Sequence, residues 1–325
     1  MSIEIGGQTT LMGVLGKGIS YSLSPKIHNY SIQCLGLNHV YVPFDISTSA
    51  RIEPFLETLW DLGSPGINIT VPYKEHVARA FGDQGLTSVN TLYRGPDGWK
   101  ATSTDGDGFA KGLALLGTPL AGFKDVFILG NGGVTLAILD SITRYFDSMP
   151  NTHIFRRNAF KDERILGRLP KGFPIHFYDF EPGVFESLVD GKSGESLVVQ
   201  ATSAPSRGEP LIAFGKALRG FNGVFVEVGY GSFSSMLETA KQKGIPCQDG
   251  RSMLLEQARL SQRYWWGKSV DQGMLRRYMG VQSWCLVVRG GGLEPPRLAP
   301  LVPQTSVSTN STTLAIAIFR YLFWE

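Results

Sequence analysis

Short apolar runs alternate along this chain with stretches whose apolar residues have helical spacing. Seven runs have the length and composition of strands, and they occupy residues 11–15, 40–44, 66–70, 126–129, 154–155, 197–200 and 224–228. Such a rhythm is typical of parallel sheets covered by helices, because each parallel strand needs a crossover connection. The pattern therefore predicts an α/β fold.

Two changes in the pattern divide the chain further. Residues 115–124 carry two glycines and a proline between a helical pattern and an apolar strand, which is typical of a connection between domains. We place the boundary slightly earlier, near Asp105. After Pro246 the pattern becomes one long amphipathic helix over residues 252–266.

The last stretch, residues 281–325, differs from the rest of the chain. It opens with three glycines and two prolines within residues 290–296 and stays rich in serine and threonine. Its apolar end, residues 314–324, is too short for a membrane span and contains Arg320. We interpret residues 281–325 as an appendage that is disordered or non-native.

Composition narrows the class of protein. With 325 residues, 42% hydrophobic and 18% charged, the chain is globular and long enough for two domains. Its net charge of +3 is spread along the sequence, which suits an anionic substrate and cofactor but demands neither nucleic acid nor a membrane as partner. The three cysteines, Cys34, Cys247 and Cys285, have no paired or metal-ligand spacing, so we expect a reducing compartment and no metal site. Without a signal-peptide pattern, we expect the cytoplasm.

The string from Ser22 to His28 places two hydroxyls at a predicted helix start. Ser24 is a good N-cap and Pro25 a good first helical residue, so Ser22 and Ser24 would lie beside free N–H groups and the positive helix end. This position favours a small carboxylate. An ordinary capped helix is the competing interpretation.

A glycine-rich turn follows the predicted strand at residues 126–129 and opens a helix. This context is what a dinucleotide-binding fold requires, with backbone N–H groups directed at a pyrophosphate. The next strand ends in Arg156 and Arg157, where an NAD site would carry an acid, so NADP is favoured over NAD. An exposed basic dipeptide is the competing interpretation. The candidate cofactor residues are Gly130, Asn131, Gly132, Gly133, Val134, Arg156 and Arg157.

Four further strings complete a recognisable set. They are Asn68-Ile69-Thr70-Val71-Pro72-Tyr73-Lys74, Val89-Asn90-Thr91, Ser103-Thr104-Asp105-Gly106 and Ser252-Met253-Leu254-Leu255-Glu256-Gln257-Ala258. With the Ser22 string, and in this order from about residue 12 to 267, they resemble the shikimate dehydrogenase family. The resemblance implies a substrate-binding domain over residues 1–104, a Rossmann-type NADP-binding domain over 105–246, and a C-terminal helical segment over 247–280 that returns to the first domain.

The resemblance also implies roles for single residues. Lys74 and Asp105 would be the catalytic pair, Ser22 and Ser24 would hold the substrate carboxylate, and the substrate hydroxyls would bind Thr70, Asn90 and Gln257. Thr202 and Tyr230 match segments near the cofactor. The implied activity is the NADP-dependent, reversible reduction of 3-dehydroshikimate to shikimate in aromatic amino acid biosynthesis, the chorismate pathway.

Some residues depart from the family pattern and leave alternatives open. Ser103 stands where the family usually has Asn, the stretch from Lys74 to Asn90 is short, and Arg156 is an added charge. A dehydrogenase for quinate or another polyol acid is therefore one alternative. A non-catalytic metabolite sensor is another, and the intact Lys74 and Asp105 argue against it. The expected partner is a small molecule, and the expected state is a monomer or homodimer.

Overall fold

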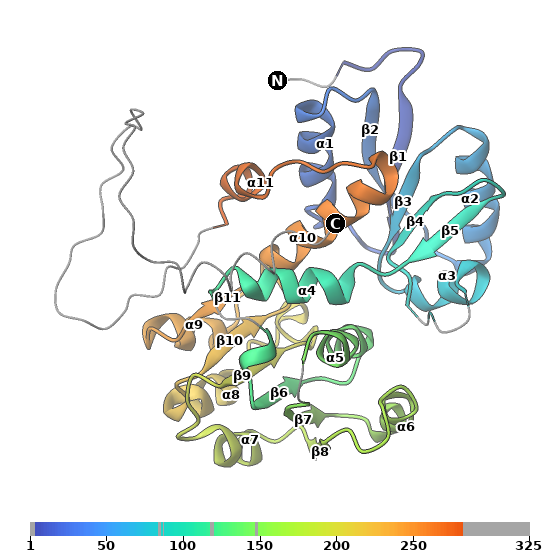
Figure 1. Ribbon diagram of the computed structural model, residues 1–325. Helices are drawn as coiled ribbons and strands as arrows, with labels where there is room; N and C mark the ends of the chain where they lie inside the picture. Colours follow the sequence, from blue (N-terminus) through green and yellow to red (C-terminus); the bar gives the residue numbers. More distant parts are fainter. Residues whose placement is uncertain (1–3, 84–85, 87, 118–119, 147–148, 282–325) are drawn as a thin grey trace, which may run out of the picture. The chain divides into compact units, whose positions relative to one another are not determined.

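The computed structural model describes residues 4–83, 86, 88–117, 120–146 and 149–281, which all lie in one compact unit, Met1–Leu286. Within this unit the strands form two separate sheets, each accompanied by helices (Figure 1). The predicted α/β class is confirmed. None of the helices in the described ranges is long and apolar enough to cross a bilayer.

The first sheet has five strands in the order β2-β1-β3-β4-β5. Their bounds are Thr10–Gly16 (β1), His39–Asp45 (β2), Gly66–Ile69 (β3), Thr91–Arg94 (β4) and Trp99–Thr102 (β5). The first three are parallel, as predicted, but β4 and β5 pair antiparallel. The sequence pattern did not predict these two antiparallel strands. These two strands have four residues each and carry Arg94 and Lys100, so they lack the apolar run that marks a buried parallel strand.

Three helices accompany the first sheet. They are Ser24–Cys34 (α1), Ile52–Asp61 (α2) and Lys74–Phe81 (α3), with a short 3₁₀ turn at Ser49–Arg51 (η1). In α2 the buried residues Ile52, Leu56 and Leu59 recur at helical spacing and pack on the sheet residues Ile67 and Ile69.

The start of α1 differs from the prediction by one residue. Ser24 is already helical and Leu23 is the N-cap, without a side-chain cap. The capping expectation for Ser24 was therefore wrong. The Ser22 hydroxyl instead accepts a hydrogen bond from the Ser24 N–H over 3.3 Å, so Ser22 satisfies one of the free donors at this helix start.

The second sheet is entirely parallel and has the order β11-β10-β9-β6-β7-β8. Its strands are Asp125–Leu129 (β6), Asn151–Arg156 (β7), Ile175–Asp179 (β8), Ser196–Gln200 (β9), Val224–Glu227 (β10) and Cys247–Gln248 (β11). The sequence pattern missed β8 and β11. Because β11 pairs with β10, the sheet extends to Gln248, beyond the boundary predicted at residue 246. The strand order reverses at β6 and β9, the place where parallel sheets bind ligands.

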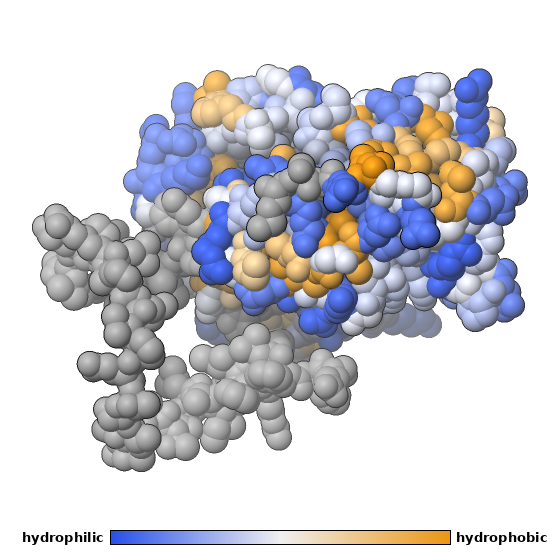
Figure 2. Space-filling model, turned by 90° about the horizontal axis from the view of Figure 1, so that it is seen from above, coloured by the Kyte–Doolittle hydropathy of each residue, from blue (hydrophilic) through white to orange (hydrophobic). Residues whose placement is uncertain are grey.

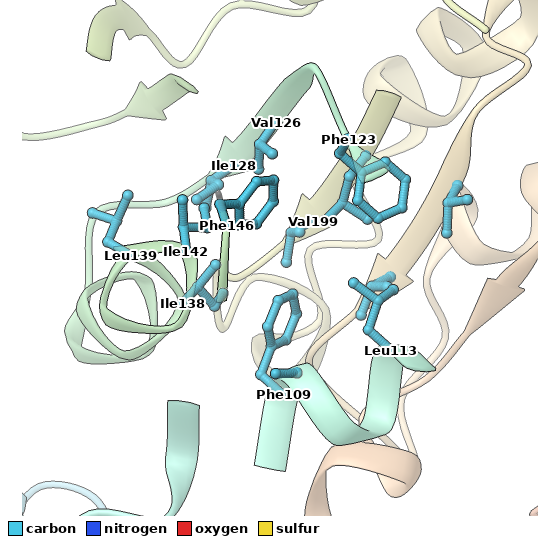
Figure 3. Close-up of a cluster of buried hydrophobic side chains, with 14 of the residues drawn as sticks. Phe109, Leu113, Phe123, Val126, Ile128, Ile138, Leu139, Ile142, Phe146 and Val199 are labelled. Atoms are coloured by element: carbon cyan, nitrogen blue, oxygen red, sulfur yellow. The ribbon is translucent and has the colours of Figure 1, made fainter. Parts of the chain in front are cut away.

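Helices lie on both faces of the second sheet. Their bounds are Asp105–Ala114 (α4), Gly133–Tyr145 (α5), Asp162–Leu166 (α6), Pro182–Val189 (α7), Ile212–Ala217 (α8) and Ser235–Gln242 (α9). Short 3₁₀ turns occur at Leu120–Gly122 (η2), Ala159–Lys161 (η3), Pro205–Arg207 (η4) and Leu218–Gly220 (η5). One core cluster joins α4 and α5 to the sheet, where Phe109 and Leu113 meet Val199 and Ile138 (Figure 3). A second cluster joins α7, α8 and α9 to the other face.

The long helix predicted over residues 252–266 is present as α10, Arg251–Trp266, and is followed by α11, Gln272–Met279. It crosses α4 closely, because a Cβ at Gly108 would lie 2.5 Å from Gln257 Cγ. It also reaches the first sheet, where the Trp265 indole N–H donates to the Leu92 carbonyl over 2.9 Å. The helix thus touches elements of both sheets.

The predicted appendage at 281–325 lies outside the described residues, with one exception. Val281 is only 9% exposed and belongs to a buried cluster with Leu275 and Met279. Its N–H donates to the Arg276 carbonyl over 2.9 Å. Residue 281 therefore belongs to the folded part, contrary to the prediction. On the face shown in Figure 2, hydrophilic side chains are spread between several apolar patches.

Candidate active site

One cavity brings together the residues that the sequence assigned to substrate binding. Its walls come from the β1–α1 connection, the end of β3, the start of α3, the loop after β10, and α10. The predicted residues in its lining are Ser22, Ser24, Thr70, Lys74, Asn90 and Gln257. Segments that are more than 200 residues apart in sequence therefore form one polar pocket.

Lys74 and Asp105 form an ion pair at this cavity. The Lys74 ammonium lies 2.7 Å from Asp105 Oδ2. Each residue is the first of its helix, α3 and α4. The α4 dipole favours the carboxylate, whereas the α3 dipole disfavours the ammonium, so the pair offsets the cost of Lys74 at a helix start. Asp105 is 3% exposed, and Lys74 lines the pocket.

The side chain of Asn90 fixes this carboxylate. Its amide nitrogen donates to Asp105 Oδ1 and to the Thr104 hydroxyl, both over 2.9 Å. Its amide oxygen accepts from the Thr104 N–H over 2.8 Å and from the Thr91 hydroxyl over 2.9 Å. The sequence assigned Asn90 to a substrate hydroxyl. In the structure it lines the pocket, but its hydrogen bonds go to the residues around Asp105, so its geometry is that of a positioning group.

The position of Gln257 depends on glycine in the facing helix. Gly108 in α4 leaves room for the Gln257 side chain, and Gly112 one turn later lets the Met253 backbone approach to 3.0 Å of an ideal Cβ position. A larger residue at Gly108 would push α10 away and move Gln257 with it.

The cavity also contains residues that the sequence analysis did not assign. Tyr21, His28 and Asn68 are the polar members of this group. His28 is buried, which lowers its pKa to about 3 and keeps the imidazole neutral, and its ring stacks on Tyr41 with 4.4 Å between centroids. The spacing of Ser24 and His28 could have indicated this position, because residues four apart share a helix face.

Tyr230 contributes to the same cavity from the second sheet. It lies in the loop after β10 and lines the pocket beside Ser22 and Lys74. Burial raises the pKa of this phenol, and the neighbouring Leu23 backbone and Ser22 side chain partly offset the shift. The sequence assigned Tyr230 to the cofactor, and the structure places it against the residues assigned to the substrate carboxylate.

The glycine-rich turn has the geometry that a dinucleotide needs. Gly130 follows β6 with φ +114°, in the region that favours glycine, and an ideal Cβ there would lie 3.1 Å from Thr202 Cγ2. Nothing lies within 4 Å of an ideal Cβ at Gly132 or Gly133, where α5 begins. The start of α5 therefore has room at these two glycines, and a helix start favours an anionic pyrophosphate. Thr202 lies beside this turn because β9 is the neighbour of β6.

Two other residues of this turn contribute differently. The Asn131 amide donates to the Asn158 carbonyl over 2.6 Å and to Asp162 Oδ1 over 3.3 Å, so it ties the turn to the loop after β7. Val134 packs its side chain against the core of the second sheet.

The two arginines after β7 have different surroundings. Arg156 pairs with Asp162 and, over 2.6 Å, with Asp179, and its side chain is 19% exposed. The prediction assigned both guanidiniums to a 2′-phosphate, and in the structure Arg156 is paired with two carboxylates. Arg157 stacks over Phe180, 4.7 Å from its centroid, and pairs with Glu209 over 2.7 Å. Both partners of this second pair are about half exposed.

A buried carboxylate, Glu227 at the end of β10, connects the end of β9 to the start of α9. It is 3% exposed and accepts hydrogen bonds from Gln200 over 3.0 Å and from Ser234 over 2.7 Å. Burial raises its pKa to about 7. The sequence gave no indication of this group, since a Glu that ends an apolar strand usually faces solvent.

A parallel sheet with a glycine-rich turn at its switch point, beside a Lys–Asp pair in a polar pocket, defines a dinucleotide-dependent oxidoreductase. The family model described as "Shikimate dehydrogenase substrate binding domain" matches residues 14–85. The chain is 32% identical to the shikimate dehydrogenase (NADP(+)) of Rubrobacter xylanophilus over 86% of this chain and 99% of that one. It belongs to the shikimate dehydrogenase family.

Solved structures agree with this assignment. The crystal structure of shikimate dehydrogenase from Aquifex aeolicus is similar with a TM-score of 0.73, at 27% identity, over 85% of this chain and 99% of that one. Quinate dehydrogenase from Corynebacterium glutamicum in complex with NAD has a TM-score of 0.69 at 23% identity, over 83% and 98% of the two chains. The second likeness shows the shared fold alone.

Proposed function

We propose that this chain catalyses the NADP-dependent, reversible reduction of 3-dehydroshikimate to shikimate, with Lys74 and Asp105 as the groups that hold and move the proton. The observation that carries the proposal is the 2.7 Å Lys74–Asp105 pair in a pocket lined by neutral hydrogen-bonding side chains. A substrate with one carboxylate and several hydroxyls needs such a pocket.

The first step is orientation of the substrate. Ser22 and Ser24 lie at the start of α1, where the helix dipole attracts the carboxylate. Thr70 and Gln257 supply hydrogen bonds to the hydroxyls. Asn90 keeps Asp105 in place, and Asp105 in turn holds the Lys74 amine toward the reacting hydroxyl. Holding the alcohol and the amine together lowers the entropic cost of the reaction.

The proton then moves through Lys74. When the ketone is reduced, the Lys74 ammonium donates a proton to the carbonyl oxygen, which becomes the hydroxyl, and the amine that is left regains a proton from solvent. In the oxidation direction Lys74 first releases a proton to solvent, and its amine then accepts the proton of the substrate hydroxyl. Asp105 stabilises the ammonium form throughout. Bound NADP supplies the hydride acceptor or donor for the carbon atom.

The second sheet holds the cofactor. We assign the pyrophosphate to Gly130, Gly132 and Gly133, with Asn131, Thr202 and the Val134 backbone around it, and the 2′-phosphate to Arg157. Residues 1–104 with 249–281 would form the substrate domain, and residues 105–248, which include β11, the cofactor domain. The role of Arg156 is then to hold the loop beside Arg157 rather than to bind phosphate.

The experiment that tests the activity is a steady-state assay with shikimate and with quinate, each with NADP and with NAD. We expect the highest kcat/KM with shikimate and NADP. A higher kcat/KM with quinate would favour the alternative that Ser103 suggests, since this residue precedes the Thr104–Asp105 segment at the site. Binding of shikimate without any turnover would favour a sensor.

A further inference from the structure

The charges around the proposed 2′-phosphate site are nearly balanced before any ligand binds. Arg156 is paired with Asp162 and Asp179, so Arg157 is the guanidinium that we assign to the 2′-phosphate. Arg157 is paired as well, since its Nη2 lies 2.7 Å from Glu209 Oε2. A phosphate that approaches Arg157 therefore meets a carboxylate already in contact with it.

The backbone of Glu209 is held in place by its turn. Its N–H donates to the Ala204 carbonyl over 2.9 Å, and it stands between Gly208, with φ +82°, and Pro210. The turn between η4 and α8 thus places the Glu209 carboxylate opposite Arg157. The pair between the arginine and Glu209 lowers the pKa of this carboxyl, so it is ionised at neutral pH.

An open groove begins beside this ion pair. Its other walls are apolar or aromatic, among them Phe180, Pro182 and Ile212, and Arg157 and Glu209 are the two charged residues in its lining. The groove accepts a flat apolar ring, and its polar end carries one positive and one negative group. A hydroxyl can donate to the carboxylate, whereas a phosphate is repelled by it.

We infer that Glu209 is a specificity-determining residue that weakens the discrimination of this enzyme for NADP over NAD. The inference rests on the proposed cofactor site. The 2′-phosphate carries about two negative charges and must displace Glu209 from Arg157 before it can form its own ion pair. Binding of NAD has no such cost, because its ribose 2′-hydroxyl can donate a hydrogen bond to Glu209 without displacing it. The pair is exposed, so the displacement is possible and the effect is moderate.

The test measures binding of two fragments, 2′,5′-ADP and 5′-AMP, which differ by the 2′-phosphate. Isothermal titration of the full chain is compared with that of Glu209→Gln, which keeps the size of the side chain and removes its charge. We expect 2′,5′-ADP to bind about threefold to fivefold more tightly to the variant, as expected for loss of an exposed charge interaction. Binding of 5′-AMP should stay equal or weaken, and the gain should shrink at high salt.

Glu195→Gln is the matched control. Glu195 forms an ion pair of the same length, 2.7 Å, with Lys124 at the amino end of the second sheet, and it is similarly exposed. An unchanged ratio of the two affinities in Glu209→Gln, or an equal change in Glu195→Gln, would overturn the inference. Calorimetry measures fragment binding directly and does not depend on catalysis. A lack of shikimate turnover would therefore contradict the proposed function without affecting this result.

Discussion

Arg164 and Glu75 join a helix beside the second sheet to a helix beside the first. Arg164 Nη1, in α6, lies 2.7 Å from Glu75 Oε1, in α3. Glu75 directly follows Lys74, and α6 begins at Asp162, the partner of Arg156. The ion pair therefore links the segment that carries the proton-transferring amine to the segment beside the cofactor site.

Breaking this link is expected to affect substrate binding more than folding. For Arg164→Gln we expect KM for shikimate to rise about twofold to threefold, since partly exposed ion pairs contribute up to about 1 kcal/mol. The melting temperature should hardly change. Lys192→Gln is a control, because it removes a pair with Asp125 within the second sheet. The exchange Arg164→Glu with Glu75→Arg should restore KM, and a failure to do so would refute the link.

Replacing Lys74 tests the proton-transfer role. We expect Lys74→Ala to remain folded while kcat falls at least about a hundredfold, as is usual when an acid–base group is lost. The cavity left by the side chain opens to solvent, so water can reach Asp105. The measurements are kcat with shikimate and NADP and a circular dichroism spectrum. Near-normal kcat in a folded variant would disprove the assignment.

The two arginines after β7 should respond differently to substitution. We expect NADP to be preferred over NAD, and Arg157→Ala to weaken the binding of NADP while sparing that of NAD, because its guanidinium is the group that we assign to the 2′-phosphate. Arg156→Ala should instead lower the melting temperature, since it leaves Asp162 and Asp179 without their partner. Equal kcat/KM for both cofactors in the unmodified enzyme would count against this interpretation.

The raised pKa of Glu227 predicts that the stability of the protein depends on pH. Burial raises its pKa from 4.5 to about 7, so the folded state binds a proton that the unfolded state releases. Its contribution is fully present below pH 4.5 and is lost as the pH rises through 7. The melting temperature of Glu227→Gln, relative to the unmodified protein, should therefore increase between about pH 5 and 8. Parallel curves of melting temperature against pH would contradict this.

The end of the fold can be tested by truncation. A chain that ends after Val281 should retain its kcat, because Val281 closes α11 and completes the cluster with Leu275 and Met279. A chain that ends after Met279 should be less stable, since it loses the N–H groups that bond to the Arg276 and Arg277 carbonyls. Thermal melting and the shikimate assay compare the two. Equal stability would refute the role of Val281.

The sequence by itself determined the elements that are long and regular. The strands β1, β6 and β9 are buried on both faces, so their apolar runs are visible without a structure, and α10 shows its helical period over sixteen residues. The resemblance to the family paired Lys74 with Asp105, and the structure places these two side chains 2.7 Å apart. The short strands β4 and β5 were missed because their pairing depends on each other rather than on their composition.

Only the tertiary structure decided which partner each charged or polar side chain has. The sequence contains Arg156 and Arg157 as neighbours, yet one faces Asp162 and Asp179 and the other faces Glu209, which lies 52 residues further on. In the same way, the side chain of Asn90 donates a hydrogen bond to Asp105, and Tyr230, from the loop after β10, lines the same pocket as Ser22. The local sequence pattern indicates burial and backbone preference, which depend on a few neighbouring residues. Ion pairs and hydrogen bonds instead require distances of about 3 Å, and the packing of distant segments sets these distances.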